Sequence, residues 1–435
     1  MKSVFKIFLL SFLFFIFIEN PVFSATISEL EKQIEQRNND LVNLQNELGK
    51  LQKELSGLNS KSNTLSKSIS ELEVSRKKLL TEIQITQSKI GNTNDIISEL
   101  EIEIGSKETS INKNKKAIET SIKKMHELDS MDVSHIILSQ KTLSEALNEI
   151  NNIVNFQKEL KNKITDLKLD QNALIETVNE KEKAKKELLK YKTEVDAQKE
   201  VVEKNKQDKT VLLKETKNQE SEYQKIIAEK EKLRAQFEAE LAEYESKLQF
   251  ILDPKTIPEA RNGVFNWPLD NILITQGFGL TKDSAKLYSH RQGAWKGKHT
   301  GIDFRANNDK VYAMASGTVV GFGNTDLSCP RASFGGWVLI KYDNGLSSIY
   351  SHLSTIVAKK GDKVLSGDLV AYSGNTGYST GPHLDVKIVP SEAVTIQTWP
   401  SKGCPGKNYT TPIVAGGTYL DPLLYLPKTT DVMWK

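Results

Sequence analysis

The chain has 435 residues, of which 26% are charged and 7% are aromatic, and its formal net charge is +3. A charge this close to balance gives no support for a protein that binds nucleic acid or strongly acidic partners. We therefore predict no nucleic-acid partner.

The N-terminus has the pattern of a secretory signal peptide. Lys2 and Lys6 precede an apolar stretch over residues 7–18, and small residues follow near position 25. A positive start, an apolar centre and small residues predict a cleaved signal peptide at residues 1–25. The stretch is shorter than the roughly 20 residues of a membrane span, and an uncleaved N-terminal anchor is the alternative. Both place the remaining chain outside the cytoplasm, as a secreted or cell-envelope protein.

The composition changes sharply along the chain. After the N-terminal segment there is no tryptophan, proline or cysteine until Asp253, and all five tryptophans and both cysteines follow that residue. Segments poor in proline and glycine form long helices, whereas the later segment has the turn residues of short strands. We predict an α + β multidomain chain with a helical coiled coil at 26–252, a linker at 253–264 and an all-β domain at 265–435.

The helical region has a regular apolar repeat. Its first members are Ile27, Leu30, Ile34, Leu41, Leu44, Leu48, Leu51, Leu55 and Leu58, and the spacing continues from Leu65. Alternating spacings of three and four are typical of a coiled-coil seam. The pattern is interrupted near residues 128–152, where we place the tip between an outgoing and a return arm. Because the arms are nearly equal in length, we predict an antiparallel hairpin, and a parallel dimer of one long helix is the alternative.

Strand-forming stretches alternate with turns after the linker. The stretches Trp337–Tyr342 and Ser347–Tyr350 flank Asn344-Gly345, and Asn-Gly between two such stretches is a strong hairpin signal. The sequence therefore predicts an antiparallel sheet in this domain.

Polar residues with metal-binding chemistry gather in the same domain. His299 lies four residues before Asp303, His352 follows the predicted hairpin, and His383 lies two residues before Asp385. Residues i and i+2 of a strand share a face. Three nitrogen or oxygen side chains with one open position make a catalytic zinc site.

These motifs, in this order, resemble the lysostaphin-type peptidoglycan metallopeptidases from about Asn266 to Pro390. The matching segments are Ile274-Thr275-Gln276-Gly277-Phe278-Gly279, His299-x-Gly301-x-Asp303, Tyr350-x-His352-Leu353 and Ser379-Thr380-Gly381-Pro382-His383-Leu384. The resemblance implies the lysostaphin-type antiparallel fold, one zinc ion, and cleavage of peptide bonds in the stem peptides or cross-bridges of peptidoglycan. It also implies roles for single residues: His299 and Asp303 as zinc ligands, His352 and His383 as catalytic residues, and Tyr350 in substrate binding.

One position departs from the family pattern. The family closes its last motif with His-x-His, and the second histidine is the third zinc ligand; here Asp385 takes that position. Aspartate also binds zinc, so we expect a His-Asp-Asp site. A site so rich in oxygen would also accept manganese.

The predicted function is an exported, metal-dependent peptidoglycan endopeptidase regulated through its coiled coil. The expected partners are peptidoglycan and, at the coiled coil, a membrane-protein regulator or a wall amidase. A murein hydrolase activator without catalysis has the same layout and is the alternative.

Both cysteines, Cys329 and Cys404, lie in expected loops of the β domain. Because an exported chain meets an oxidising compartment, we predict a disulfide between them, with free thiols as the alternative.

Overall fold

The computed structural model describes residues 27–58, 64–129, 142–247, 260–261, 263–281, 284–289, 295–331, 333–401, 404–428 and 433–434. The predicted signal peptide, most of the predicted linker and residues 130–141 of the predicted tip lie outside these residues. The chain divides into two compact units, one made of the residues up to Asn39 with Gly91–Glu187, the other of Asp40–Ile90 with Leu188–Lys435. Among the described residues, no helix combines the length and hydropathy that a membrane crossing requires.

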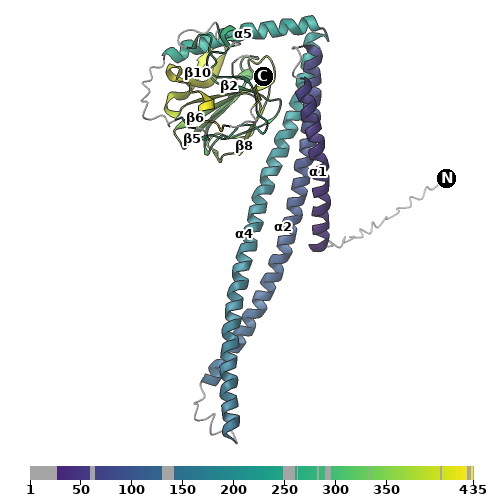
Figure 1. Ribbon diagram of the computed structural model, residues 1–435, viewed down its shortest axis with the longest axis vertical. Coiled ribbons are helices and arrows are strands. Elements are labelled where there is room, and N and C mark those ends of the chain that lie inside the picture. The colour runs from purple at the N-terminus through teal and green to yellow at the C-terminus, as the bar shows by residue number, and fades with distance from the viewer. Residues whose placement is uncertain are drawn as a thin grey trace, which may run out of the picture. The chain divides into compact units, whose positions relative to one another are not determined.

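In the N-terminal part, the described residues form four long helices (Figure 1). They are α1 (Ile27–Leu58), α2 (Leu65–Asp129), α4 (Leu143–Thr216) and α5 (Glu220–Lys247). In the first unit, the Lys107 Nζ donates to Thr177 Oγ1 at 2.8 Å, and Lys181 pairs with Glu101 at 3.0 Å. The earlier residue of α2, Glu101, contacts the later residue of α4, Lys181, so the two helices run antiparallel there.

The outgoing arm is not the continuous helix that the apolar repeat predicted. It ends at Leu58 and restarts at Leu65. In the first unit, Arg37 of α1 pairs with Asp95 of α2 at 3.3 Å, so α1 lies beside α2 instead of extending it. Leu58 and Leu65 are seven residues apart, which is one full heptad repeat. The apolar spacing therefore continues across the break, and the repeat gives no sign that the helix ends there.

The return arm is also divided. α4 ends at Thr216 and α5 begins at Glu220. Between them, Lys217 and Asn218 have φ values of 47° and 58°, a left-handed backbone that ends a helix.

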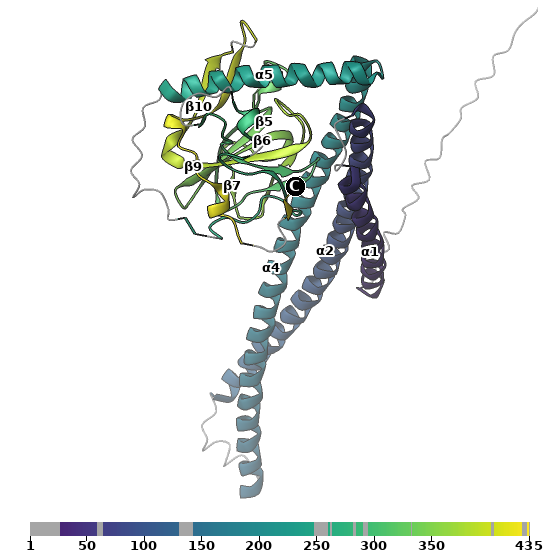
Figure 2. The same ribbon diagram turned by 45° about the horizontal axis from the view of Figure 1, so that its top comes forward.

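The second unit contains the β domain. Its main sheet has the strands β1 (Leu273–Gln276), β2 (Ile302–Arg305), β3 (Lys310–Tyr312), β4 (Gly317–Asn324), β5 (Gly336–Tyr342), β6 (Leu346–Ile356), β7 (Lys363–Val364), β8 (Leu369–Ser373), β9 (His383–Pro390) and β12 (Met433–Trp434). The strand order is β12-β1-β2-β9-β6-β5-β4-β7, with β8 pairing both β6 and β3. All pairs are antiparallel except β1 with β12. β10 (Val394–Pro400) and β11 (Asn408–Val414) form a separate hairpin. The ribbons of the sheet and the hairpin are coloured from green to yellow in Figure 2.

Two apolar clusters support the sheet from its two sides. One contains Phe304, Tyr350 and Val386. The other contains Trp337 and Tyr409 and includes Leu241 of α5. A disulfide joins Cys329 to Cys404 beside the second cluster, with the Cα atoms 6.0 Å apart.

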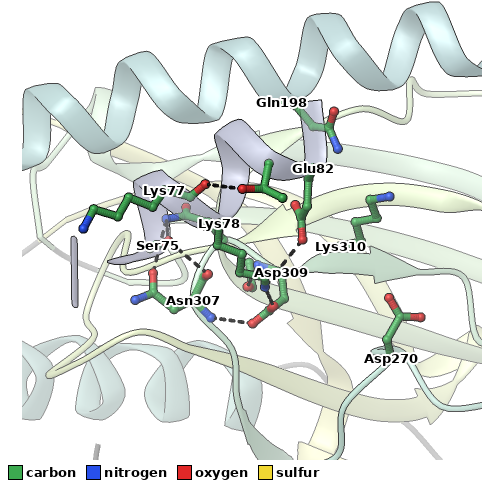
Figure 3. A network of polar contacts seen from close by, with 12 residues as sticks. Ser75, Lys77, Lys78, Glu82, Gln198, Asp270, Asn307, Asp309 and Lys310 are labelled. Carbon is green, nitrogen blue, oxygen red and sulfur yellow. Dashed lines mark hydrogen bonds and ion pairs between the residues drawn. The ribbon is translucent and has the colours of Figure 1, made fainter. Parts of the chain in front are cut away.

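Within the second unit, α2 contacts the β domain through a buried lysine. The Lys78 side chain is only 4% exposed and pairs with Glu82, one turn further along α2, and with Asp309 between β2 and β3 (Figure 3). Burial lowers the pKa of Lys78, but Asp309 and Glu82 raise it by more, so the ammonium stays charged. Beside it, Asn308 donates to Ser75 Oγ at 3.0 Å. These polar contacts attach the first turns of α2 to the chain that follows β2.

Candidate metal centre and catalytic histidines

The candidate site lies where β6 changes its neighbour. Ser351 pairs with Asp385 of β9, whereas Leu353 pairs with Ser373 of β8. His352 lies between these two pairs, at the point where β8 replaces β9 beside β6. The partner strands separate here, and side chains from several strands can therefore converge.

Three metal-binding side chains meet beside this point. Asp303 of β2 lies directly opposite Asp385 of β9 in the antiparallel register, which brings two such side chains together on one face. His299 precedes β2 and is held by paired backbone hydrogen bonds with Gly279. The His299 Nε2 lies 3.4 Å from Asp303 Oδ1 and 3.7 Å from Asp385 Oδ1. One donor atom from each residue lies within 4.8 Å of the others.

These distances fit a tetrahedral cation. Donor atoms at 2.0–2.1 Å from a tetrahedral zinc ion are about 3.3 Å apart. The Asp385 Oδ1 is buried and has no hydrogen-bond partner among the described residues. Burial raises the pKa of Asp385, but Lys387, His299 and His352 together lower it to about 2. The carboxylate is therefore ionised, and a cation would satisfy its open oxygen.

All three histidines of the site are held through the same ring nitrogen. The Nδ1 atoms of His299, His352 and His383 lie 3.2, 2.9 and 2.8 Å from the carbonyl oxygens of Gly277, Thr376 and Gly381. A carbonyl only accepts, so each Nδ1 carries the proton and each Nε2 offers a lone pair. His299 thus presents the nitrogen that a metal requires, and the other two present nitrogens that can take a proton.

The backbone of His352 is unusual, and it aims the ring at the site. On a regular strand His352 would face away from Ser351, on the opposite side of the sheet from Asp385. Its φ is instead +63°, a left-handed conformation that is costly for a residue with a Cβ. The ring reaches His383, with the two centroids 4.5 Å apart. The His383 Nε2 lies 4.0 Å from Asp303 Oδ1, so both rings border the donor cluster.

The structure places Tyr350, which the resemblance implied for substrate binding, in the core of the domain. Its side chain is completely buried in the same cluster as Val386, on the core side of the sheet. Its hydroxyl lies 2.7 Å from the Tyr342 hydroxyl and accepts a hydrogen bond from the Met314 amide at 3.2 Å. On a regular strand Tyr350 and His352, two residues apart, would share a face. The left-handed backbone at His352 breaks that alternation.

Two further residues of the site were not predicted. The Tyr288 ring stacks on His299 with centroids 5.3 Å apart. Lys387, buried on β9, pairs with Asp385. Lys387 lies two residues after Asp385 on the same face of its strand, and this spacing was the available signal.

The pH dependence of folding stability tests whether His352 is buried in its neutral form. Burial, with the neighbouring His383, lowers the pKa of His352 well below its ordinary value of 6.5. Below pH 6.5 the imidazole of His352 is therefore protonated in the unfolded chain but not in the folded chain. As the pH falls, the free energy of unfolding decreases by up to about 1.4 kcal/mol per pH unit. We expect chemical denaturation of chelator-treated protein at pH 7, 6 and 5 to show this loss, and His352→Gln to reduce it. An identical pH dependence in both proteins would contradict this setting of the ring.

Comparison with known proteins gives the same assignment for this region. Residues 297–396 match the sequence model of Peptidase family M23. The matched range includes His299, Asp303, His352, His383 and Asp385. The fold and the site therefore agree with a domain of that family.

Several of the similar curated proteins are endopeptidases by their names. The chain is 38% identical over 92 residues to the peptidoglycan DD-endopeptidase ShyA of Vibrio cholerae, which is 21% of this chain and 20% of that protein. It is 39% identical over 92 residues to lysostaphin of Staphylococcus simulans, covering 20% of this chain and 17% of that protein. The matches thus span about a fifth of the length of these relatives.

Comparison with solved structures gives similar matches. The lysostaphin catalytic domain from Staphylococcus simulans is 25% identical, with 34% of this chain and 87% of that chain covered and a TM-score of 0.23. A zinc-containing peptidase from Vibrio cholerae is 28% identical, with 30% and 37% covered and a TM-score of 0.24.

Proposed function

We propose that this chain, which carries a Peptidase family M23 domain at residues 297–396, is a metal-dependent endopeptidase that cleaves peptide bonds in peptidoglycan. The observation that supports this most strongly is the convergence of His299 Nε2, Asp303 Oδ1 and Asp385 Oδ1 at donor spacing. Two more histidines border the same cluster. A non-catalytic activator would have no need of this combination.

Zinc is the proposed ion, because one histidine and two carboxylates suit it. When bound, it would polarise the scissile carbonyl and acidify a water molecule. Manganese, which oxygen ligands also suit, remains a prediction.

His383 is the proposed general base. Its Nδ1 is held by the Gly381 carbonyl at 2.8 Å and lies 2.9 Å from Ser379 Oγ, and its Nε2 lies on the side of Asp303, where it would accept a proton. The proton would then pass to the leaving amine, as in other hydrolases. His352, kept neutral by burial, would orient the attacking water through its own Nε2.

Digestion of purified peptidoglycan tests the proposed function. We expect the zinc-supplied full-length protein to release fragments whose masses show hydrolysis of a peptide bond. Substrates with direct and with glycine cross-bridges should be compared, since the relatives include a peptidoglycan DD-endopeptidase and a glycyl-glycine endopeptidase. Intact substrate of both kinds, combined with stimulation of a wall amidase, would favour the activator.

We also propose that the helices regulate the site. In the second unit, Lys204 of α4 donates to the Ser354 carbonyl at 2.6 Å, two residues beyond His352. Lys230 of α5 donates to the Ser379 carbonyl at 3.2 Å, and Ser379 contacts His383. A regulator that moves these helices would therefore act on the chain segments that hold both histidines.

Removing both helix contacts should increase digestion, because the segments beside the histidines would gain freedom to admit a peptide. The variant is Lys204→Ala with Lys230→Ala, and initial rates of digestion are the measurement. Lys209→Ala is the matched control, since Lys209 pairs with Glu73 on α2 and not with the β domain. Equal rates in the double variant and the control would refute regulation through these contacts.

Export to the cell envelope is the remaining proposal. It is supported by the signal-peptide pattern of residues 1–25 and by the cell-wall substrates named for the relatives. The expected result is a mature protein whose N-terminus lies near Ala25, measured by mass spectrometry of the envelope fraction. A chain that retains Met1 and fractionates with the cytoplasm would refute it.

A further inference from the structure

Lys387 is a buried cation directly behind the metal donors. It lies on β9, two residues after Asp385, and only 5% of its side chain is exposed. Its ammonium pairs with Asp385 Oδ2 and lies 5.3 Å from the centre of the Phe334 ring. A buried ammonium is strongly destabilising without a counter-charge, and Asp385 supplies one.

The two oxygens of Asp385 face different partners. Oδ2 accepts from Lys387, whereas Oδ1 lies 3.7 Å from His299 Nε2, on the side of the donor cluster. Gly301 leaves the space for this arrangement. A Cβ there would lie 2.5 Å from Asp385 Oδ1 and 2.9 Å from Lys387 Cγ. The surrounding chain therefore accommodates the pair as a unit.

Charge explains why the pair should function together. His299 is a neutral donor and Asp303 carries one negative charge, while Asp385 and Lys387 together carry none. An Asp385–Lys387 pair therefore offers the metal one oxygen donor at no net charge, as a histidine offers one nitrogen donor at no net charge.

We propose that Lys387 is a positioning residue that makes Asp385 equivalent to a neutral third metal ligand. It holds Oδ2, so that Oδ1 alone faces the metal, and it cancels the second carboxylate charge. This rests on the metal site proposed above and adds a residue that acts through a ligand rather than on the substrate.

The proposal predicts that Asp385→His does not by itself give a good zinc site. The new histidine would leave Lys387 buried without a carboxylate, facing a divalent cation. Replacing Lys387 by methionine in the same chain removes that cation while keeping much of the side-chain volume. Only the double variant should therefore restore a zinc site of ordinary charge.

The test is zinc affinity, measured by competition with a chromophoric chelator in the full-length protein. We expect Asp385→His to bind zinc about 10- to 100-fold more weakly than Asp385→His with Lys387→Met, the range found when residues that support ligands are lost. Equal affinities in these two proteins would overturn the proposal. A purely structural lysine would change folding stability without this difference in affinity.

If Asp385→His does not fold, variants of Lys387 in the chain that keeps Asp385 test the proposal instead. With Asp385 in place, Lys387→Met should change the visible absorption of the Co²⁺-loaded protein, because both carboxylate oxygens become available, and Lys387→Arg should preserve it. Identical spectra for wild type and both variants would overturn the proposal. Neither measurement uses peptidoglycan, so failure of the hydrolase proposal and failure of this one are distinguishable.

Discussion

Asp303→Ala is expected to abolish stoichiometric zinc binding and to reduce peptidoglycan digestion by more than about 100-fold. Loss of a residue that merely supports a ligand costs 10- to 100-fold, and Asp303 is proposed as a ligand itself. Its Oδ1 lies 3.4 Å from His299 Nε2, and its backbone is fixed opposite Asp385 in the β2–β9 register. Zinc content and initial digestion rate are the two measurements.

The matched control for this variant is Asp343→Ala. Asp343 is an exposed aspartate in the turn between β5 and β6 of the same domain. The control should retain both zinc and activity. Normal zinc content in Asp303→Ala would contradict the assignment of Asp303 as a ligand.

His383→Ala is expected to reduce digestion by about 10²- to 10⁴-fold while zinc remains bound, because a positioned general base contributes this much. His383 Nε2 faces the donor cluster at 4.0 Å from Asp303 Oδ1, yet the ring is not among the three metal-binding residues. The variant thus separates proton transfer from metal binding. Digestion rate and zinc content should be measured on the same sample.

His126→Ala provides the control for this variant, since His126 is an exposed histidine on α2. It should leave digestion unchanged. If His383→Ala lost its zinc, His383 would be a ligand and not the base, and if it kept full activity, the base would lie elsewhere.

Much of the fold followed from residue types and spacings. The absence of proline between residues 26 and 253 predicted long helices, and Asn344-Gly345 predicted the hairpin between β5 and β6, both of which the structure contains. The division of the helices did not follow. Leu58 and Leu65 keep the seven-residue spacing across the break, and the polar stretch Asn59-Ser60-Lys61-Ser62-Asn63, rich in turn-forming residues, was the signal available there.

The site was partly predictable for a related reason. The spacing of His383 and Asp385 placed both on one face of a strand, and the structure has them on β9 beside Asp303. The burial of Tyr350 on the face away from the site was not predicted, because nothing in a strand-like stretch signals the positive φ at His352. The ion pair between Asp385 and Lys387 could not be predicted, because it depends on the burial of both side chains, and burial follows from the packing of the whole domain.

The proposed function requires that one metal ion, bound by His299, Asp303 and Asp385, is needed for peptidoglycan hydrolysis. The most direct measurement removes metal from the full-length protein with a chelator and then follows fragment release while zinc is returned in steps. We expect no release from the metal-free protein and full recovery near one zinc per chain. A folded protein that binds one zinc per chain and leaves peptidoglycan intact would contradict the proposed function.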